Sequence, residues 1–264
     1  MAKFSNKLII SDIDGTLINS NNQLTNETVE AIKYFMAEGG KFAFATGRNP
    51  IGIKALDDTV VSNAPSICYN GSLLYDFRKN ESIKTLFIDN SAKQVVNRIF
   101  NERPEAAIEI HKDSKIYELR PNEATKIHFS IVKFDPIFVN NLDEIPFPWV
   151  KIGFWLGEDE VQNFSEYVKS IMGEKFSYTR VHRNSTELLH KDSDKGFMLD
   201  EYRKLYDGVE IIACGDNQND VLMLKNADIS FAPKNAADCA KRAAKYTLDV
   251  TNDEHFIKHV IERL

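Results

Sequence analysis

The chain has 264 residues, of which 43% are hydrophobic and 27% are charged. This composition is typical of a globular protein with a sizeable core and excludes disordered, collagen-like and coiled-coil chains. The 33 basic and 39 acidic residues give a net charge of −6, so no overall positive field favours nucleic acid as a partner. Apolar runs are far shorter than the about 18 residues that a membrane span needs, and no signal-peptide core follows the N-terminus. We therefore expect a cytoplasmic protein that does not bind membranes.

The first 82 residues alternate apolar runs with helix-like periods, and the strongest turn signal of the chain, Asn70-Gly71, follows the run at 66–69. We expect strands at 7–11, 41–45 and 66–69, with helices from Thr25 to Gly39 and across 51–58. Strands that alternate with helices in this way are the signature of a parallel sheet with helices on its faces.

From about Ser82 the pattern changes to strands with few helices. We expect strands at 83–88, 107–110, 115–119, 127–133, 150–156 and 176–182, and helices at 91–103 and 158–172. Such a segment is typical of an antiparallel α+β unit, here inserted into the first domain. Residues 188–194 are expected to be a linker out of it.

The first pattern then resumes, with expected helices at 196–205, from about Asn219, at 235–245 and at 255–263, and strands at 209–214 and 229–232. The fold class is therefore α/β: a Rossmann-like three-layer core with a parallel sheet, built from residues 1–82 and 187–264, and an inserted α+β domain at 83–186.

Polar residues come directly after three of the expected core strands. They are Asp12 to Thr16, then Thr46-Gly47-Arg48, and then Gly215 to Asp220. Each group alone has the composition of an ordinary turn or helix cap. Together they predict a site, because ligands of open parallel sheets bind in the crevice outside the carboxyl ends of the strands.

Carboxylates dominate this predicted site: Asp12, Asp14, Asp216 and Asp220. Two carboxylates about 4 Å apart repel by about 4 kcal/mol at an effective dielectric constant of 20, so a positive group must hold them together. Mg²⁺ suits this role because it prefers carboxylate and water oxygens and leaves positions for phosphate. An EF-hand loop does not fit, since one begun at Asp12 would need Gly at Leu17.

The order and spacing of these residues resemble the four motifs of the haloacid dehalogenase (HAD) superfamily of phosphatases. The matching segments are Asp12-x-Asp14-Gly-Thr16, Thr46-Gly-Arg48, Lys195 before Gly196, and Gly215-Asp216-x-x-Asn219-Asp220. The insertion between the second and third motifs resembles the cap of the type IIB, Cof-like members. The resemblance covers essentially the whole chain and implies that residues 83–186 are a substrate-specificity cap.

The resemblance also implies catalytic roles for four residues of these motifs. Asp12 would be the nucleophile that forms an aspartyl-phosphate, and Asp14 would protonate the leaving oxygen and then deprotonate water. Thr46 would bind a phosphate oxygen through its hydroxyl group, as would the side chain of Asn219. Lys195 would supply positive charge to the phosphoryl oxygens and to Asp12.

The implied metal is Mg²⁺, held by the side chains of Asp12 and Asp216 and the backbone carbonyl of Asp14. Asp220 belongs to the same metal site, where it would position Lys195 or a metal-bound water. Gly47, Arg48 and Asn70 complete the implied phosphate and substrate site. For Arg48 two alternatives stay open, a substrate anion or a neighbouring carboxylate, and Asn70 is either near the leaving group or a purely structural turn residue.

These residues together predict Mg²⁺-dependent hydrolysis of a small phosphorylated metabolite, a sugar phosphate or a phosphorylated cofactor. The alternatives are a phosphomutase of the same superfamily and a non-catalytic sensor of a phosphate ligand. The sensor is disfavoured because binding alone does not need both a nucleophile and an acid/base. The substrate and the oligomeric state are not specified by any residue of the chain.

Overall fold

A computed structural model of the protein describes residues 2–112, 115–132 and 134–264. The chain forms two compact units. The first, which we call the core unit, consists of Met1–Lys84 and Asp194–Leu264, and the second, the cap unit, is Thr85–Ser193. The cap unit is thus a continuous segment inserted into a discontinuous one.

A five-stranded parallel sheet forms the centre of the core unit. Its strands in spatial order are β14 (Tyr246–Thr247), β13 (Ile229–Ala232), β12 (Glu210–Cys214), β1 (Lys7–Ser11) and β2 (Lys41–Phe44). Four of the five residues of β1 are buried, without alternation. A continuous buried run is expected for a strand whose two faces are both covered.

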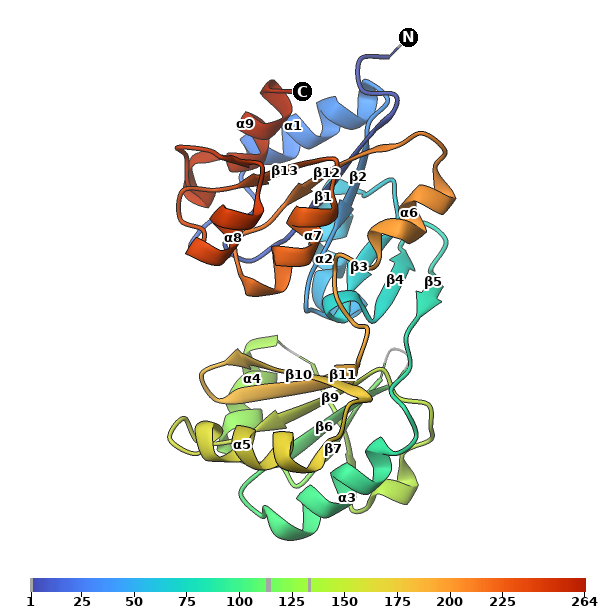
Figure 1. The fold of residues 1–264 in the computed structure, drawn as a ribbon, viewed down its shortest axis with the longest axis vertical. Coiled ribbons are helices and arrows are strands. Elements are labelled where there is room, and N and C mark those ends of the chain that lie inside the picture. The colour runs from blue at the N-terminus through green and yellow to red at the C-terminus, as the bar shows by residue number, and fades with distance from the viewer. Residues whose placement is uncertain (1, 113–114, 133) are drawn as a thin grey trace. The chain divides into compact units, whose positions relative to one another are not determined.

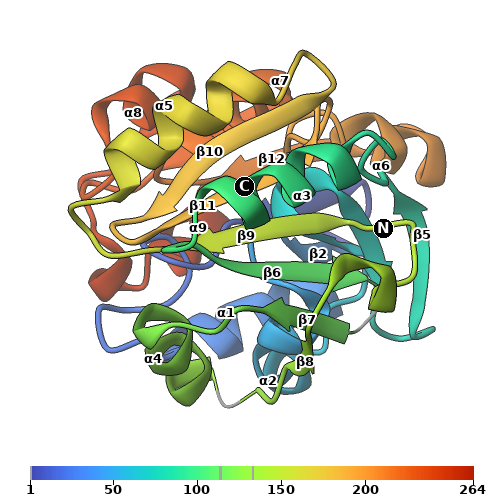
Figure 2. The ribbon, with the colours of Figure 1, turned by 90° about the horizontal axis from the view of Figure 1, so that it is seen from below.

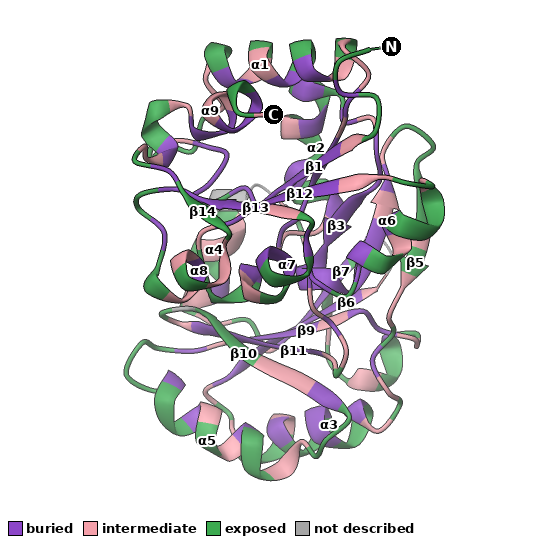
Figure 3. Ribbon diagram, turned by 45° about the horizontal axis from the view of Figure 1, so that its top comes forward, coloured by how far each residue is buried: buried purple, intermediate pink, exposed green. Residues whose placement is uncertain are grey.

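Helices cover both faces of this sheet (Figures 1 and 3). On one face lie α1 (Asn26–Ala37) and α9 (Phe256–Glu262), and on the other lie α7 (Val221–Asn226) and α8 (Asp238–Ala243). The remaining helices of the unit are α2 (Pro50–Val60) and α6 (Leu199–Leu205). This arrangement confirms the predicted three-layer α/β fold with a parallel sheet.

The third expected strand of the core unit belongs to a separate sheet. This sheet has the order β3 (Ser66–Cys68), β4 (Leu73–Asp76) and β5 (Glu81–Thr85), and β3 pairs antiparallel with β4. A 3₁₀ turn at Tyr69–Gly71 joins β3 to β4, and both Tyr69 and Asn70 have positive φ values. The strand expected at 83–88 is β5, which begins two residues earlier and belongs to this sheet. The turn at Asn70 allows β4 to pair with β3.

A six-stranded sheet forms the centre of the cap unit, and its strands are antiparallel except for the β7–β8 pair. In spatial order they are β10 (Phe176–His182), β11 (Ser185–His190), β9 (Lys151–Trp155), β6 (Ala107–Lys112), β7 (Lys115–Leu119) and β8 (Ile137–Val139). Two helices, α3 (Ala92–Glu102) and α5 (Val161–Ile171), lie across one face of this sheet (Figure 2). Their apolar side chains and those of the strands form the hydrophobic core of the unit.

Two expectations for the cap unit are wrong. The strand expected at 127–133 is helix α4 (Glu123–Val132), and Lys133 lies outside the described residues. The segment is helical because Asn122 caps the N-terminus of α4. Its side chain accepts a hydrogen bond from the backbone N–H of Thr125 at 3.1 Å. The linker expected at 188–194 is also wrong in part, since residues up to His190 pair in β11.

In the described residues, no helix combines the length and apolar character that crossing a membrane requires.

Replacing a side chain of the cap core should destabilise the cap unit. Phe164 is fully buried and its ring centroid lies 5.3 Å from that of Phe154. We expect Phe164→Ala to lower the free energy of unfolding by about 3 to 5 kcal/mol, because it leaves a cavity. Phe138→Ala is the matched control, since Phe138 is 65% exposed. Equal effects of the two changes in urea denaturation would contradict the assigned packing.

Candidate active site

The carboxyl ends of β1, β2 and β12 lie at the same edge of the core sheet because the three strands are parallel and adjacent. The pairing continues one residue past β1, where the N–H of Asp12 donates to the carbonyl oxygen of Cys214 at 2.9 Å. After β2, the N–H of Ala45 donates to the oxygen of Ser11 at 2.8 Å. The loops that begin here carry the polar residues predicted from the sequence.

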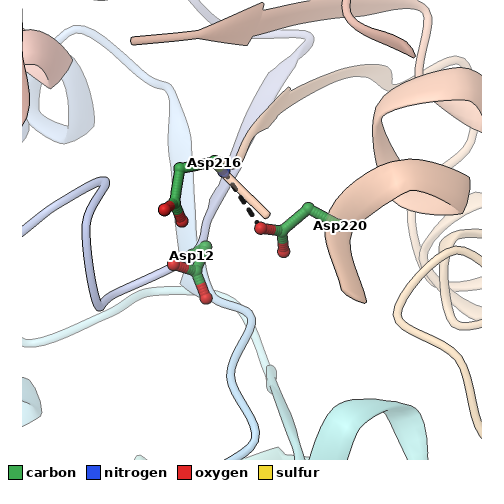
Figure 4. A group of neighbouring side chains, drawn as sticks. All are labelled: Asp12, Asp216 and Asp220. Atoms are coloured by element: carbon green, nitrogen blue, oxygen red, sulfur yellow. Dashed lines mark hydrogen bonds between the residues drawn. The ribbon is translucent and has the colours of Figure 1, made fainter. Parts of the chain in front are cut away.

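Three carboxyl groups meet at this edge: those of Asp12, Asp216 and Asp220 (Figure 4). One oxygen of each lies within 4.8 Å of the others. Asp12 is 6% exposed and Asp220 is fully buried. The structure thus brings together residues that are about 200 positions apart in the chain, as the strand order predicts.

Lys195 lies between two of these carboxyl groups. Its Nζ is 2.7 Å from Oδ1 of Asp12 and 2.7 Å from Oδ1 of Asp220, and its side chain is fully buried. These two partners raise the pKa of Lys195, against the effect of burial, so the ammonium group stays charged. Gly196 allows this placement, because a Cβ there would lie 2.6 Å from the backbone of Leu222.

Asp220 organises the loop that follows β12. Its Oδ2 accepts hydrogen bonds from the backbone N–H groups of Asp216 and Asn217, each at 3.0 Å. Gly215 lies so close that a Cβ there would be 2.5 Å from the Cβ of Asp220. Both oxygens of Asp220 therefore have donors from the protein, which suits a group that positions Lys195 and the backbone of Asp216.

Asp216 is held from the loop after β1. The hydroxyl group of Thr16 donates to its Oδ1 at 3.1 Å. Gly15 has a φ of +83°, and a Cβ there would lie 2.5 Å from Oδ2 of Asp216, so only glycine suits this position. Thr16 was not among the predicted site residues, although its place directly after Gly15 in the first motif is a signal for it.

The charges of the cluster do not balance, since three carboxyl groups face a single ammonium group. Burial raises the pKa of Asp12 well above its usual value, and repulsion from Asp220 and Asp216 adds to this while Lys195 opposes it. Burial and Asp220 likewise raise the pKa of Asp216 to about 6. A second positive charge would let both groups ionise, and an all-oxygen donor set fits a hard divalent cation.

Four further predicted residues lie together next to this cluster. The side-chain amide of Asn219 donates to Oδ1 of Asn70 at 3.1 Å, and the N–H of Asn70 donates to the carbonyl oxygen of Thr46 at 3.0 Å. A Cβ on Gly47 would lie 2.9 Å from Nδ2 of Asn70. Hydroxyl, amide and backbone groups from three loops are thus available for the oxygens of a phosphate group.

Asp14 and Arg48 form a separate pair. Arg48 donates from Nε to Oδ2 of Asp14 at 3.0 Å and from Nη2 to Oδ1 at 2.5 Å. The carboxyl group of Asp14 is not part of the three-carboxylate group, and its side chain is 53% exposed. Of the two alternatives for Arg48, the structure shows the neighbouring carboxylate.

A second set of buried ionisable residues lies in the cap unit, where the sequence motifs gave no indication of it. It comprises Glu109, His111, Glu118 and Glu187, on the sheet face opposite α3 and α5, and the partly buried Lys151 forms an ion pair with Glu187. Burial raises the pKa of Glu109 and Glu118 and lowers that of His111. The alternation Ile108-Glu109-Ile110-His111 predicts a strand with one apolar and one polar face. It does not indicate that the polar face is buried, because a polar face is usually exposed to water.

The sequence profile of the haloacid dehalogenase-like hydrolases matches residues 9–261 of the chain. YxeH of Bacillus subtilis is 29% identical over an alignment of 272 positions that covers 98% of each chain. The 5-amino-6-(5-phospho-D-ribitylamino)uracil phosphatase YwtE of Bacillus subtilis is 26% identical, again over 98% of each chain. Among solved structures, TM0651 from Thermotoga maritima matches with a TM-score of 0.87 and 22% identity over 97% of each chain, a similarity of fold.

Removing the ammonium group of Lys195 should destabilise the core unit strongly, because Asp12 and Asp220 would remain buried without it. We expect Lys195→Met to lower the free energy of unfolding by about 3 to 5 kcal/mol at pH 7. Lys204→Met is the matched control, since Lys204 also contacts a carboxylate, Glu201 at 3.0 Å, but is 68% exposed. A similar small effect of both changes in urea denaturation would contradict the buried geometry.

In the metal-free protein, the free energy of unfolding should fall as the pH rises from about 4 to about 6. The folded state holds the proton of Asp216 more tightly than the unfolded chain, because its pKa is raised from 3.8 to about 6, and this advantage is lost as the pH rises. We expect a loss of about 1 to 2 kcal/mol, less than the full shift because Asp216 is partly exposed to water.

Urea denaturation in EDTA at the two pH values measures this loss. Asp216→Asn should make the profile flatter, whereas Asp200→Asn, at a side chain that is 73% exposed, should leave it unchanged. An unchanged slope in Asp216→Asn would show that this carboxyl group titrates normally.

Proposed function

The chain belongs to the haloacid dehalogenase-like hydrolases, and from this membership we propose that it is a Mg²⁺-dependent phosphatase of small phosphomonoesters. The observation that carries the proposal is the buried carboxyl group of Asp12, held by Lys195 next to Asp216 at the carboxyl ends of the core strands. A carboxylate fixed in this way can act as a nucleophile toward phosphorus, and the neighbouring ammonium group stabilises the charge that develops.

The reaction takes place in two steps. In the first, a carboxylate oxygen of Asp12 forms a bond to phosphorus while the bond from phosphorus to the leaving oxygen breaks, and that oxygen takes a proton from Asp14. In the second, water gives its proton to Asp14 and its oxygen to phosphorus, and the bond between phosphorus and Asp12 breaks. The products are an alcohol and inorganic phosphate, and both aspartates return to their initial states.

The non-bridging phosphate oxygens are bound by the groups that gather around Thr46. Its hydroxyl group and the side-chain amide of Asn219 donate to them, together with the ammonium group of Lys195. Asn70 holds Asn219 in place through the hydrogen bond at 3.1 Å, and Gly47 leaves room for Asn70. The substrate's phosphoryl group is therefore oriented by three separate loops of the core unit.

The side chains of Asp12 and Asp216 and the backbone carbonyl of Asp14 would hold the metal. Mg²⁺ held there would neutralise charge on the carboxylates and on the transferred phosphoryl group. Asp220 would position Lys195 and the loop after β12 without binding the metal directly, because its two oxygens already accept hydrogen bonds from Lys195 and from the backbone.

The cap unit selects the leaving group. The support for this role is that Glu109, His111, Glu118 and Glu187 are buried on one sheet face, where ionisable side chains are rare. YwtE is named for a substrate with a phosphorylated ribityl chain. This chain accordingly acts on a small soluble metabolite, with phosphosugars as the first class to test and phosphorylated cofactors as the second.

Replacing Asp12 should abolish turnover. We expect Asp12→Asn to lower phosphate release from a panel of phosphorylated metabolites by at least about 10³-fold, equal to about 4 kcal/mol of barrier. EDTA should stop release by the unchanged protein, and added Mg²⁺ should restore it. Asp200→Asn on α6 is the control, since its side chain is 73% exposed and contacts Arg203.

Three outcomes would contradict the proposal. Undiminished release by Asp12→Asn would end the nucleophile assignment, and full activity in EDTA would end the metal assignment. Conversion of a phosphosugar into its isomer without free phosphate would identify a phosphomutase.

A further inference from the structure

The arrangement of Arg48 and Asp14 indicates a role that the phosphate chemistry alone does not assign. Arg48 contacts Asp14 side-on, with Nε on one carboxylate oxygen at 3.0 Å and Nη2 on the other at 2.5 Å. Two parallel bonds from a planar guanidinium group fix both the position and the plane of a carboxylate. In the described residues, no other side chain makes a hydrogen bond that the structure records for this carboxylate.

Arg48 is itself held at the start of α2. Its backbone N–H donates to the hydroxyl oxygen of Thr46 at 3.1 Å, and its Nη1 is 3.4 Å from the carbonyl oxygen of Gly52. Asn49 caps the helix by accepting from the N–H of Gly52 at 2.6 Å. The guanidinium group thus bridges the first turn of α2 and the loop after β1, and its three nitrogens all contact protein oxygens.

The pair differs from the buried cluster in its exposure. The side chains of Arg48 and Asp14 are 34% and 53% exposed, whereas that of Lys195 is fully buried. Exposed ion pairs contribute little to stability, so this contact is not needed to hold the fold together. Because the two hydrogen bonds contribute little to stability, orienting Asp14 during the reaction explains them better than holding the fold together does.

We propose that Arg48 is a positioning residue that orients the carboxyl group of Asp14 for proton transfer to the leaving oxygen. This inference rests on the proposed function, in which Asp14 gives that oxygen its proton as the bond to phosphorus breaks. A misdirected carboxyl group would leave nucleophilic attack by Asp12 intact but would leave the departing oxygen without its proton. In the first step the loss therefore depends on how much the leaving group needs protonation, whereas the second step, in which Asp14 takes a proton from water, is the same for every substrate.

Substrates whose leaving groups differ in basicity distinguish the orientation of Asp14 from substrate binding and from a purely structural role. An alkyl phosphate releases a strongly basic alkoxide that requires a proton, whereas p-nitrophenyl phosphate releases a stable phenolate. We expect Arg48→Ala to lower the rate of leaving-group release in the first turnover by about 10²-fold for alkyl phosphates and by less than about threefold for p-nitrophenyl phosphate, since general acid catalysis and orientation contribute factors of this size. The substrate concentration that gives half of the maximal first-turnover rate should stay within about twofold for both substrates, because in this role Arg48 does not bind the phosphate group.

The conservative variant and a double-mutant cycle test the contact between the two side chains. Arg48→Lys keeps the charge but cannot make two parallel bonds, so its first-turnover rate for alkyl phosphates should lie between those of the unchanged protein and Arg48→Ala. Asp14→Asn should show the same dependence on the leaving group, and adding Arg48→Ala to it should cause no further loss. Arg203→Ala is the matched control, since Arg203 is 37% exposed and contacts Asp200 at 3.1 Å on α6.

The possible outcomes are distinct. Equal first-turnover losses for both substrates in Arg48→Ala, with a raised half-saturating substrate concentration, would show that Arg48 binds the substrate anion and would overturn the inference. Equal first-turnover losses with an unchanged half-saturating concentration and a lowered melting temperature would show a structural role and would also overturn it. If Asp12→Asn retains activity, or Asp14→Asn slows leaving-group release equally for both substrates in the first turnover, the proposed function itself fails, whatever Arg48→Ala does.

Discussion

Repulsion among three carboxyl groups around a single buried ammonium group is the constraint on which this protein depends. Water would separate such groups, and only a rigid scaffold can hold them within 4.8 Å of each other. Burial raises the pKa values of Asp12 and Asp216, and repulsion from the neighbouring carboxyl groups adds to this rise. A site of this kind is stabilised by a cation that neutralises part of its negative charge.

The parallel sheet supplies the rigidity. Strands β1 and β12 are adjacent and buried, so the loops after them begin at fixed positions, with the N–H of Asp12 still bonded to Cys214. Glycines then let the loops approach more closely than other residues would allow: Gly215 against Asp220 and Gly15 against Asp216. The most regular part of the fold thus brings the charges together, whereas the pair of Asp14 and Arg48 is partly exposed to water.

The sequence was sufficient for the core fold and less so for the cap unit. Uniformly apolar runs such as residues 7–11 predict strands covered on both faces, and this is what the parallel sheet requires. In the segment 127–133, alternating Ile127, Phe129 and Ile131 resemble a strand, yet Ile127 is 60% exposed on α4. The side chain of Asn122 caps the helix there and favours it over a strand. The spacing of hydrophobic residues alone does not reveal this local interaction.

For the site, the sequence could predict which side chains meet but not how they are paired. The carboxyl ends of parallel strands converge by topology, so Asp12 and Asp216 were expected to be neighbours from strand order alone. Which group Arg48 contacts depends instead on the exact course of the loop between β2 and α2. The sequence pattern does not determine this course. The same holds for Glu109 and His111, where alternation predicts two faces of a strand but does not say that both are buried. Topology therefore determines the chemistry that is available, and side-chain packing determines which groups act together.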